Sequence, residues 1–205
     1  MISVTHTAAV DVRRRIHWVQ LATIAWMIVE AATSLFAAWR AHSPALLAFG
    51  GDSAIELLSA VMVLWSIRTV AAETHRKKNI DRAVGGLLFA LATYVVAVSS
   101  LTLARHREPK PTFLGMAVLI AAAIIMPVLA KEKRKLSAAT GSAALRADAV
   151  QSATCAYLSV IVLCGLAVNA IWHVSWADPV AALAIVPFLV WEGREAMQGK
   201  PCECC

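Results

Sequence analysis

The chain has 205 residues, of which 60% are hydrophobic and only 16% are charged, and its formal net charge is +6. Soluble domains are roughly 45–50% apolar with about 25% charged residues, so this composition excludes a disordered or collagen-like chain and argues against a soluble enzyme. The mean hydropathy of +0.68 instead favours a membrane protein, provided that the apolar residues are gathered in blocks.

Six apolar blocks bounded by charged residues, Pro or Gly follow one another along the chain. They cover residues 16–39, 44–67, 83–104, 112–130, 144–171 and 179–191. The first five are long enough for a helix to cross about 30 Å of hydrocarbon, and the sixth is long enough if residues 193–197 extend its helix. Only helices and closed barrels satisfy the backbone in lipid, and the alternating pattern of a barrel strand is missing. We therefore predict an all-α integral membrane protein with six transmembrane helices.

The Lys and Arg residues between these blocks predict the orientation. Fifteen of the 19 lie in the N-terminal arm, the second and fourth loops and the tail, and the other four lie in the first and third loops. Cytoplasmic loops carry the excess of Lys and Arg, so both termini are expected in the cytoplasm and the chain in the inner (plasma) membrane. These basic residues are dispersed without interleaved aromatic residues, which argues against nucleic-acid binding.

The expected organisation has three parts. Residues 1–15 form a cytoplasmic arm, residues 16–197 the six-helix transmembrane domain, and residues 198–205 a cysteine-rich cytoplasmic tail. The first apolar block is too long for the apolar region of a signal peptide and lacks a small-residue cleavage site, so we interpret it as a true first helix.

Two carboxylates in the second block are the strongest site candidates. Asp52 and Glu56 are four residues apart and therefore lie one turn apart on one helix face, near the membrane centre. An ionisable residue inside a span is by default a candidate functional residue. Two such acids repel each other when both are ionised, so a divalent metal or protons must neutralise them. The alternative is a structural, hydrogen-bonded acid pair.

The fifth block repeats this spacing with Gln151 and Cys155, beginning one turn deeper than Asp148. In the expected orientation Cys155 lies at the depth of Asp52 and Gln151 at the depth of Glu56. These four side chains would form a cage whose thiolate and carboxylates suit a tetrahedral ion such as Zn²⁺. The alternatives are a Cys155 that is only a small buried apolar residue and a Gln151 that hydrogen-bonds neighbouring helices.

Several further residues are secondary candidates. Glu30, inside the first block, is either a metal or proton relay or a structural hydrogen-bond acceptor. Asp148 either lines an entry path, as a second relay group, or pairs with Arg146. The three thiols of Cys202, Cys204 and Cys205 are candidates for capturing a soft ion on the reducing cytoplasmic side, against the alternative of a plain solvated tail. His75 is a weaker candidate for a peripheral site.

Residues 44–56, 146–155 and 176–179 resemble the second helix, the fifth helix and the entry to the sixth helix of the cation diffusion facilitator family. The resemblance implies a transporter that exports a divalent metal, usually zinc, from the cytoplasm in exchange for protons by alternating access. It also implies a homodimer, and no permanently bound cofactor. Carried over by motif, the metal ligands match Asp52, Glu56, Gln151 and Cys155.

This chain departs from the family pattern at two places. Gln151 and Cys155 stand where the family has His or Asp followed by Asp, which shifts the expected preference toward Cd²⁺ or Hg²⁺. The cysteine-rich tail stands where most members continue into a cytoplasmic domain.

Two rival functions remain open at this point. The first is a non-transporting membrane protein that binds or senses metal through its C-terminal cysteines. The second is a membrane thiol-redox enzyme using Cys155 or Cys164, and the fact that neither of these two residues belongs to a C-x-x-C pair argues against it.

Overall fold

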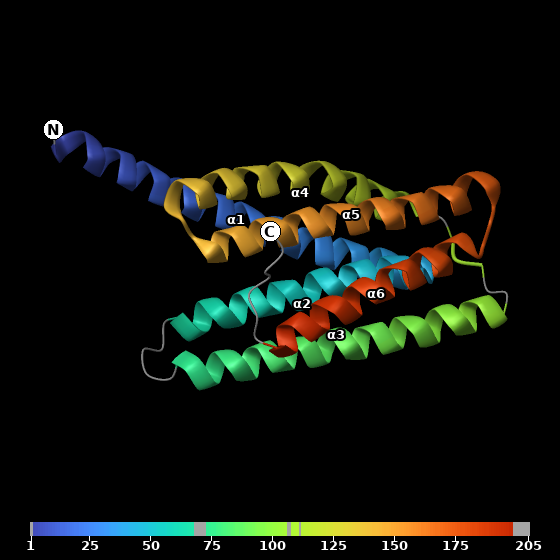
Figure 1. Ribbon diagram of the computed structural model, residues 1–205. Coiled ribbons are helices and arrows are strands. Elements are labelled where there is room, and N and C mark those ends of the chain that lie inside the picture. Colours follow the sequence, from blue (N-terminus) through green and yellow to red (C-terminus); the bar gives the residue numbers. More distant parts are fainter. Residues whose placement is uncertain (1, 68–72, 106–107, 111, 199–205) are drawn as a thin grey trace.

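The computed structural model describes residues 2–67, 73–105, 108–110 and 112–198. Within them lie six helices: α1 (Ile2–Ala41), α2 (Pro44–Ile67), α3 (Glu73–Ala104), α4 (Phe113–Thr140), α5 (Ala143–Trp172) and α6 (Ala177–Gln198). The helices run back and forth along one long axis (Figure 1). The predicted all-helical fold is confirmed, since every regular element in the described part of the chain is a helix.

Within the described residues, four helices are long and apolar enough to cross a membrane. The segments are Arg14–Ala41, Arg82–Ala104, Phe113–Thr140 and Leu145–Trp172. Their outer faces expose large apolar side chains, such as Ile124, Val128 and Tyr157. A face this apolar is suited to lipid and not to water. Exposed aromatic residues also mark the helix ends, where membrane proteins concentrate Trp.

The connections between helices define two ends of the bundle. The C-terminal ends of α2 and α4 lie with the N-terminal ends of α1, α3 and α5 at one end of the bundle, and the C-terminal ends of α1, α3 and α5 lie at the opposite end (Figure 1). Lys131, Lys133, Arg134 and Lys135 are close to the first of these ends, which we call the basic end. Lys and Arg residues that are clustered in the sequence after the fourth apolar block thus also lie together near one end of the bundle.

Three helices extend by about ten residues or more beyond the spans expected from the sequence. One is α3, which begins at Glu73 instead of residue 83. α1 begins at Ile2, so the predicted N-terminal arm continues the first helix. α4 continues to Thr140, whereas residues 131–142 were expected to form a loop. The residues added to α4 are mostly good helix formers such as Lys, Leu and Ala. The helix ends at Gly141, whose φ of 67° is a left-handed conformation that glycine adopts without steric cost.

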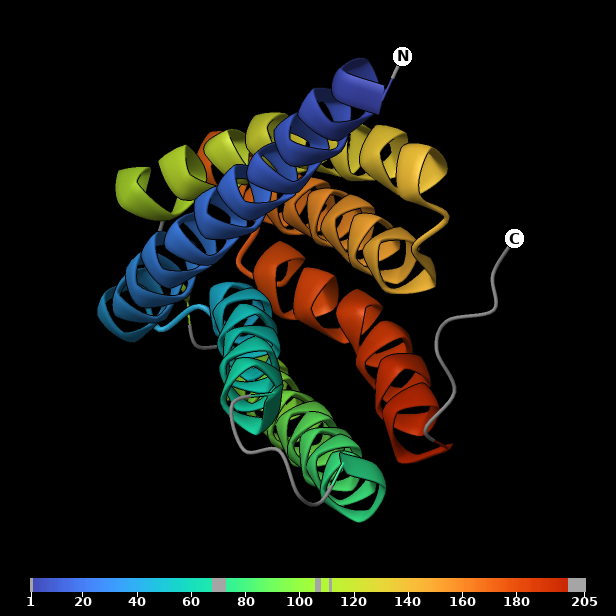
Figure 2. The same ribbon diagram turned by 90° about the vertical axis from the view of Figure 1, so that its left-hand side faces the viewer.

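The core of the bundle surrounds α2. This helix contacts α1, α3, α5 and α6, while α3 packs closely on α6 and α4 on α5. Figure 2 shows the same arrangement along the bundle, with α6 running beside the α2–α3 pair. Phe49 and Leu46 of α2 are fully buried together with Leu88, Leu158 and Ile185 of the neighbouring helices. Polar groups on the inner face of α2 are consequently enclosed on several sides.

Candidate metal site

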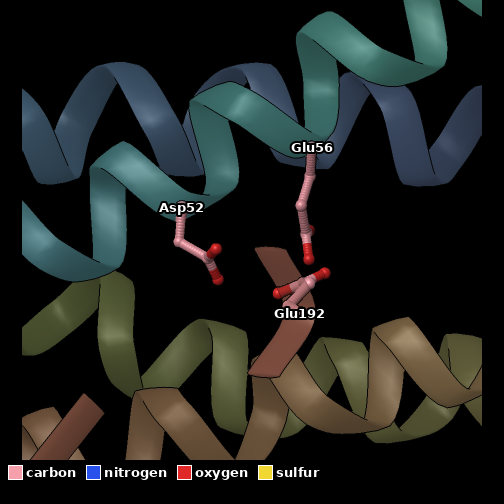
Figure 3. Close-up of side chains that lie close together, drawn as sticks. All are labelled: Asp52, Glu56 and Glu192. Atoms are coloured by element: carbon pink, nitrogen blue, oxygen red, sulfur yellow. The ribbon is translucent and has the colours of Figure 1, made fainter. Parts of the chain in front are cut away.

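Three carboxylates converge inside the bundle. Asp52 and Glu56 of α2 and Glu192 of α6 each place one oxygen within 4.8 Å of the others. Figure 3 shows the three side chains pointing toward one another across the space between the two helices. Asp52 and Glu56 are only 2% and 8% exposed. The pair expected on one face of the second helix is therefore directed inward and joined by a third acid.

Two adjacent glycines bring α2 close to its neighbours just before the acids. A Cβ atom on Gly50 would lie 2.9 Å from Ser34 Cβ of α1, and one on Gly51 would lie 2.8 Å from Leu91 Cδ1 of α3. Both distances are shorter than real Cβ contacts. At Gly50 a Cβ would also lie 3.0 Å from the Leu35 backbone N, so glycine is needed there, whereas at Gly51 the Leu91 side chain would have to move. The rotation of α2 about its axis is thereby restricted, which holds Asp52 and Glu56 toward the interior.

The carboxylates have oxygen atoms that no hydrogen bond satisfies. Asp52 Oδ1, Glu56 Oε1 and Glu192 Oε2 are buried without a partner among the described residues. An unsatisfied buried polar atom is costly, and an unpaired buried charge is more costly still. A cation between the three groups would offset both costs, which makes this cluster the strongest candidate for binding a metal ion.

Glu192 is not among the site residues predicted from the sequence, although it lies within the predicted transmembrane domain, directly after the apolar block of residues 179–191. The helix continues to Gln198, so Glu192 lies inside it. The sequence does contain a signal that Glu192 lies inside the sixth span. A helix needs about 20 residues to cross the bilayer, and a span that starts at Pro179 must therefore include this acid.

The start of α6 is tied to the start of α2. Ser43 donates a hydrogen bond to Asp178 Oδ2, and the Ala45 backbone N–H donates to Asp178 Oδ1 at 3.1 Å. Asp178 thus accepts from one free N–H group at the N-terminus of α2, where negative charge is favourable, and Ser43 Oγ accepts from the next one, that of Leu46. This contact sets how far α6 slides along α2 and so sets the depth of Glu192 relative to Glu56.

Gln151 of α5 lies against the cluster. Its Nε2 donates to Glu192 Oε1 at 3.3 Å, and the same side chain contacts Glu56. A glutamine amide carries both donor hydrogens and an acceptor oxygen, so rotation of the amide presents either one to the centre. The structure therefore brings three helices to one point, with Gln151 between the acids of the other two.

The comparisons with known proteins bear on this arrangement. The sequence model of one protein family, described as the cation efflux transmembrane domain, matches residues 20–197 of this chain. The chain belongs to this family. The match extends from α1 to the end of α6 and so includes every residue of the cluster. Members of the cation efflux family transport metal cations, and this chain is a membrane-embedded metal cation transporter. No curated protein matches the sequence.

Cys155 and Glu30 form a separate contact within the cation efflux domain. The Cys155 thiol donates to Glu30 Oε1 at 3.1 Å, and Ser53 Oγ donates to the same oxygen at 2.7 Å. Trp26 Nε1 donates to Glu30 Oε2 at 2.6 Å. Among the described residues, Cys155 does not belong to the group of ligand atoms that meet within 4.8 Å. Glu30 therefore has three donors, in contrast to the unsatisfied acids of the cluster.

Asp148 lies nearer the basic end, in contact with a buried lysine. Lys133 Nζ is 2.8 Å from Asp148 Oδ1 and 2.8 Å from Ser152 Oγ, and the Lys133 side chain is fully buried. Gln20 Nε2 donates to Asp148 Oδ2 at 2.7 Å. The ion-pair partner of Asp148 is thus Lys133 of α4, and the contact links α1, α4 and α5.

The remaining candidates cannot be compared with the structure. Cys202, Cys204 and Cys205 lie outside the described residues, and the side chain of His75 is likewise not described. A role for the tail in metal capture stays a prediction.

Proposed function

We propose that this member of the cation efflux family exports a divalent metal ion from the cytoplasm in exchange for protons. We also propose that Asp52 and Glu56 are two of the ligands that bind this ion. The observation that carries the proposal is the pair of buried, unpartnered carboxylate oxygens on α2. Zn²⁺ is the ion most often transported by the family that the sequence resembles. Cd²⁺ and Hg²⁺ are the alternatives if the thiol of Cys155 also ligates.

The proposed direction depends on which end faces the cytoplasm. We assign the basic end to the cytoplasm because Lys and Arg are concentrated there, in accord with the positive-inside rule. Both termini then lie in the cytoplasm, and the protein is placed in the plasma membrane. Homodimerisation through the transmembrane helices is part of the same proposal.

In the proposed cycle the carboxylates of Asp52 and Glu56 bind the metal ion first and protons afterwards. Metal entering from the basic end loses water and binds the ionised carboxylates, so binding requires the release of protons. Movement of the helices relative to one another then opens the site to the other side of the membrane. Protons arriving from that side neutralise the carboxylates and displace the ion. No catalytic reaction is involved.

Transport into inverted membrane vesicles tests this proposal. With an imposed pH gradient, wild-type vesicles are expected to accumulate Zn²⁺, and collapse of the gradient should stop accumulation. Asp52→Ala should abolish uptake, whereas Glu132→Ala, which removes a carboxylate paired with Arg15 and Lys135 near the basic end, should retain it. Uptake by Asp52→Ala at the wild-type rate would overturn the assignment.

A further inference from the structure

We propose that Glu192 of α6 supplies the third ligand of the transported ion, so that the site lies between α2 and α6 and has an oxygen donor set. This inference rests on the proposed function. It adds the third ligand and the class of ion: divalent ions that accept carboxylate and amide oxygens, such as Zn²⁺ and Mn²⁺, in preference to the thiol-seeking Cd²⁺ and Hg²⁺.

The geometry of the carboxylates is the first argument. One oxygen each from Asp52, Glu56 and Glu192 lies within 4.8 Å of the other two. Metal–oxygen bonds of about 2.0–2.2 Å place the oxygens bound to one ion roughly 3–4.5 Å apart, so small side-chain movements are sufficient for all three to bind.

The unsatisfied atoms are the second and independent argument. Asp52 and Glu56 are more than nine-tenths buried, and each has an oxygen without a hydrogen-bond partner among the described residues. Glu192 is only partly buried as a residue, but its Oε2 atom is buried and also has no hydrogen-bond partner among the described residues. A purely structural acid cluster would be expected to satisfy these atoms with donors, as Glu30 is satisfied by Ser53, Cys155 and Trp26.

The placement of the thiol is the third argument, because it removes the soft donor from the centre. Cys155 donates to Glu30 and does not join the three carboxylates within the described part of the molecule. The side chain that does reach the cluster from α5 is Gln151, whose amide oxygen is another hard donor. Carboxylate and carbonyl oxygens suit Mn²⁺ and Zn²⁺, while thiolates select softer ions.

The position of Glu192 is held by contacts at both ends of α6. Asp178 binds the N-terminus of α2, and Gly193 packs against Gly85 of α3 so closely that a Cβ on Gly85 would lie 2.7 Å from the Gly193 carbonyl oxygen. The acid is thus fixed beside α2 by its own helix, as a ligand in a preformed site must be.

Equilibrium dialysis with purified protein in lipid nanodiscs tests the third ligand. Glu192→Gln should weaken Zn²⁺ binding by more than about tenfold, since even outer-shell partners of a metal contribute roughly 10–100-fold. Glu132→Gln is the matched control, the same change at a carboxylate that pairs with Arg15 and Lys135 outside the three-carboxylate group, and should bind within about twofold of wild type. Zn²⁺ affinity within about twofold of wild type in Glu192→Gln, combined with its loss in Asp52→Asn, would overturn this inference and leave the proposed function standing. Retention in both variants would overturn the proposed function itself.

A second measurement decides the donor set without depending on the folding of Glu192→Gln. In a chain with Cys164, Cys202, Cys204 and Cys205 changed to Ser, Cys155 is the only thiol. Bound Cd²⁺ should then give no ultraviolet cadmium–thiolate band, and the band should appear once Glu192→Cys is added. A band from Cys155 alone, or no band from Glu192→Cys with Cd²⁺ bound, would overturn the inference.

Discussion

The Cys155 thiol of α5 lies 3.1 Å from Glu30 Oε1 of α1, so the one buried thiol among the described residues donates a hydrogen bond to an acid next to the three-carboxylate cluster. Ser53, which follows Asp52 directly in the chain, donates to the same oxygen. Glu30 thus connects α1, α2 and α5 at the level of the site, and its hydrogen bonds contribute to holding the acids of α2 in place.

The contribution of this thiol to stability is open to a direct test. Cys155→Ala leaves Glu30 with two donors and should lower the free energy of unfolding by about 1–2 kcal/mol, since a lost hydrogen bond to a charged group costs on that order. Cys155→Ser keeps a donor and should lose less. Thermal unfolding in nanodiscs without metal gives the comparison, and equal losses in the two variants would contradict a role for the bond.

The buried Lys133 predicts a strong effect of changing its partner. Asp148→Asn leaves a fully buried ammonium without a carboxylate and should destabilise the protein by about 3 kcal/mol. Adding Lys133→Met should recover part of this loss, because the uncompensated charge is then removed. Glu132→Gln, at a solvent-accessible ion pair, is the control and should destabilise the protein far less, because water screens that pair. Denaturant unfolding of wild type, Asp148→Asn, Lys133→Met and the double variant measures the coupling, and additive losses would argue against the pair.

Two neighbouring glycines of α3 provide a matched test of helix packing. A Cβ on Gly85 would lie 2.6 Å from Met197 Cγ and 2.7 Å from the Gly193 carbonyl oxygen, whereas a Cβ on Gly86 would contact nothing within 4 Å. Gly85→Ala should therefore destabilise the fold by about 1–3 kcal/mol and reduce transport, because α6 and Glu192 must move. Gly86→Ala should be neutral or stabilising by up to about 1 kcal/mol. Loss of transport in both variants, or in neither, would contradict the packing shown.

Metal binding should depend on pH in a defined direction. The ligand carboxylates bind metal in their ionised form, so protons compete and Zn²⁺ affinity should fall as the pH is lowered. Calorimetry in two buffers of different ionisation enthalpy counts the protons released on binding. Wild type should release more protons than Asp52→Asn, and an identical number would show that Asp52 does not take part.

Much of the fold could be predicted from the sequence because lipid imposes simple rules. A spanning segment must be apolar over about 20 residues and must be helical, so the positions of the helices follow from composition alone. The predicted boundaries failed where a helix leaves the apolar region, as at Lys131–Thr140 of α4, since helix formation there does not require apolar residues. The resemblance to metal exporters, confirmed at the level of the family, came from the short motifs around Asp52 and Asp148.

The sequence by itself determined the all-helical membrane fold and placed Asp52 and Glu56 together, because residues four apart on a helix must share a face. Only the tertiary structure decided which other side chains they meet. It placed Glu192 opposite them, turned Cys155 toward Glu30 and enclosed Lys133 beside Asp148. The physical reason is that a helix apolar on most of its surface gives little indication of which face points inward. Its rotation and depth are set by contacts between helices, such as Gly85 with Gly193 and Asp178 with Ser43, that join residues distant in the chain.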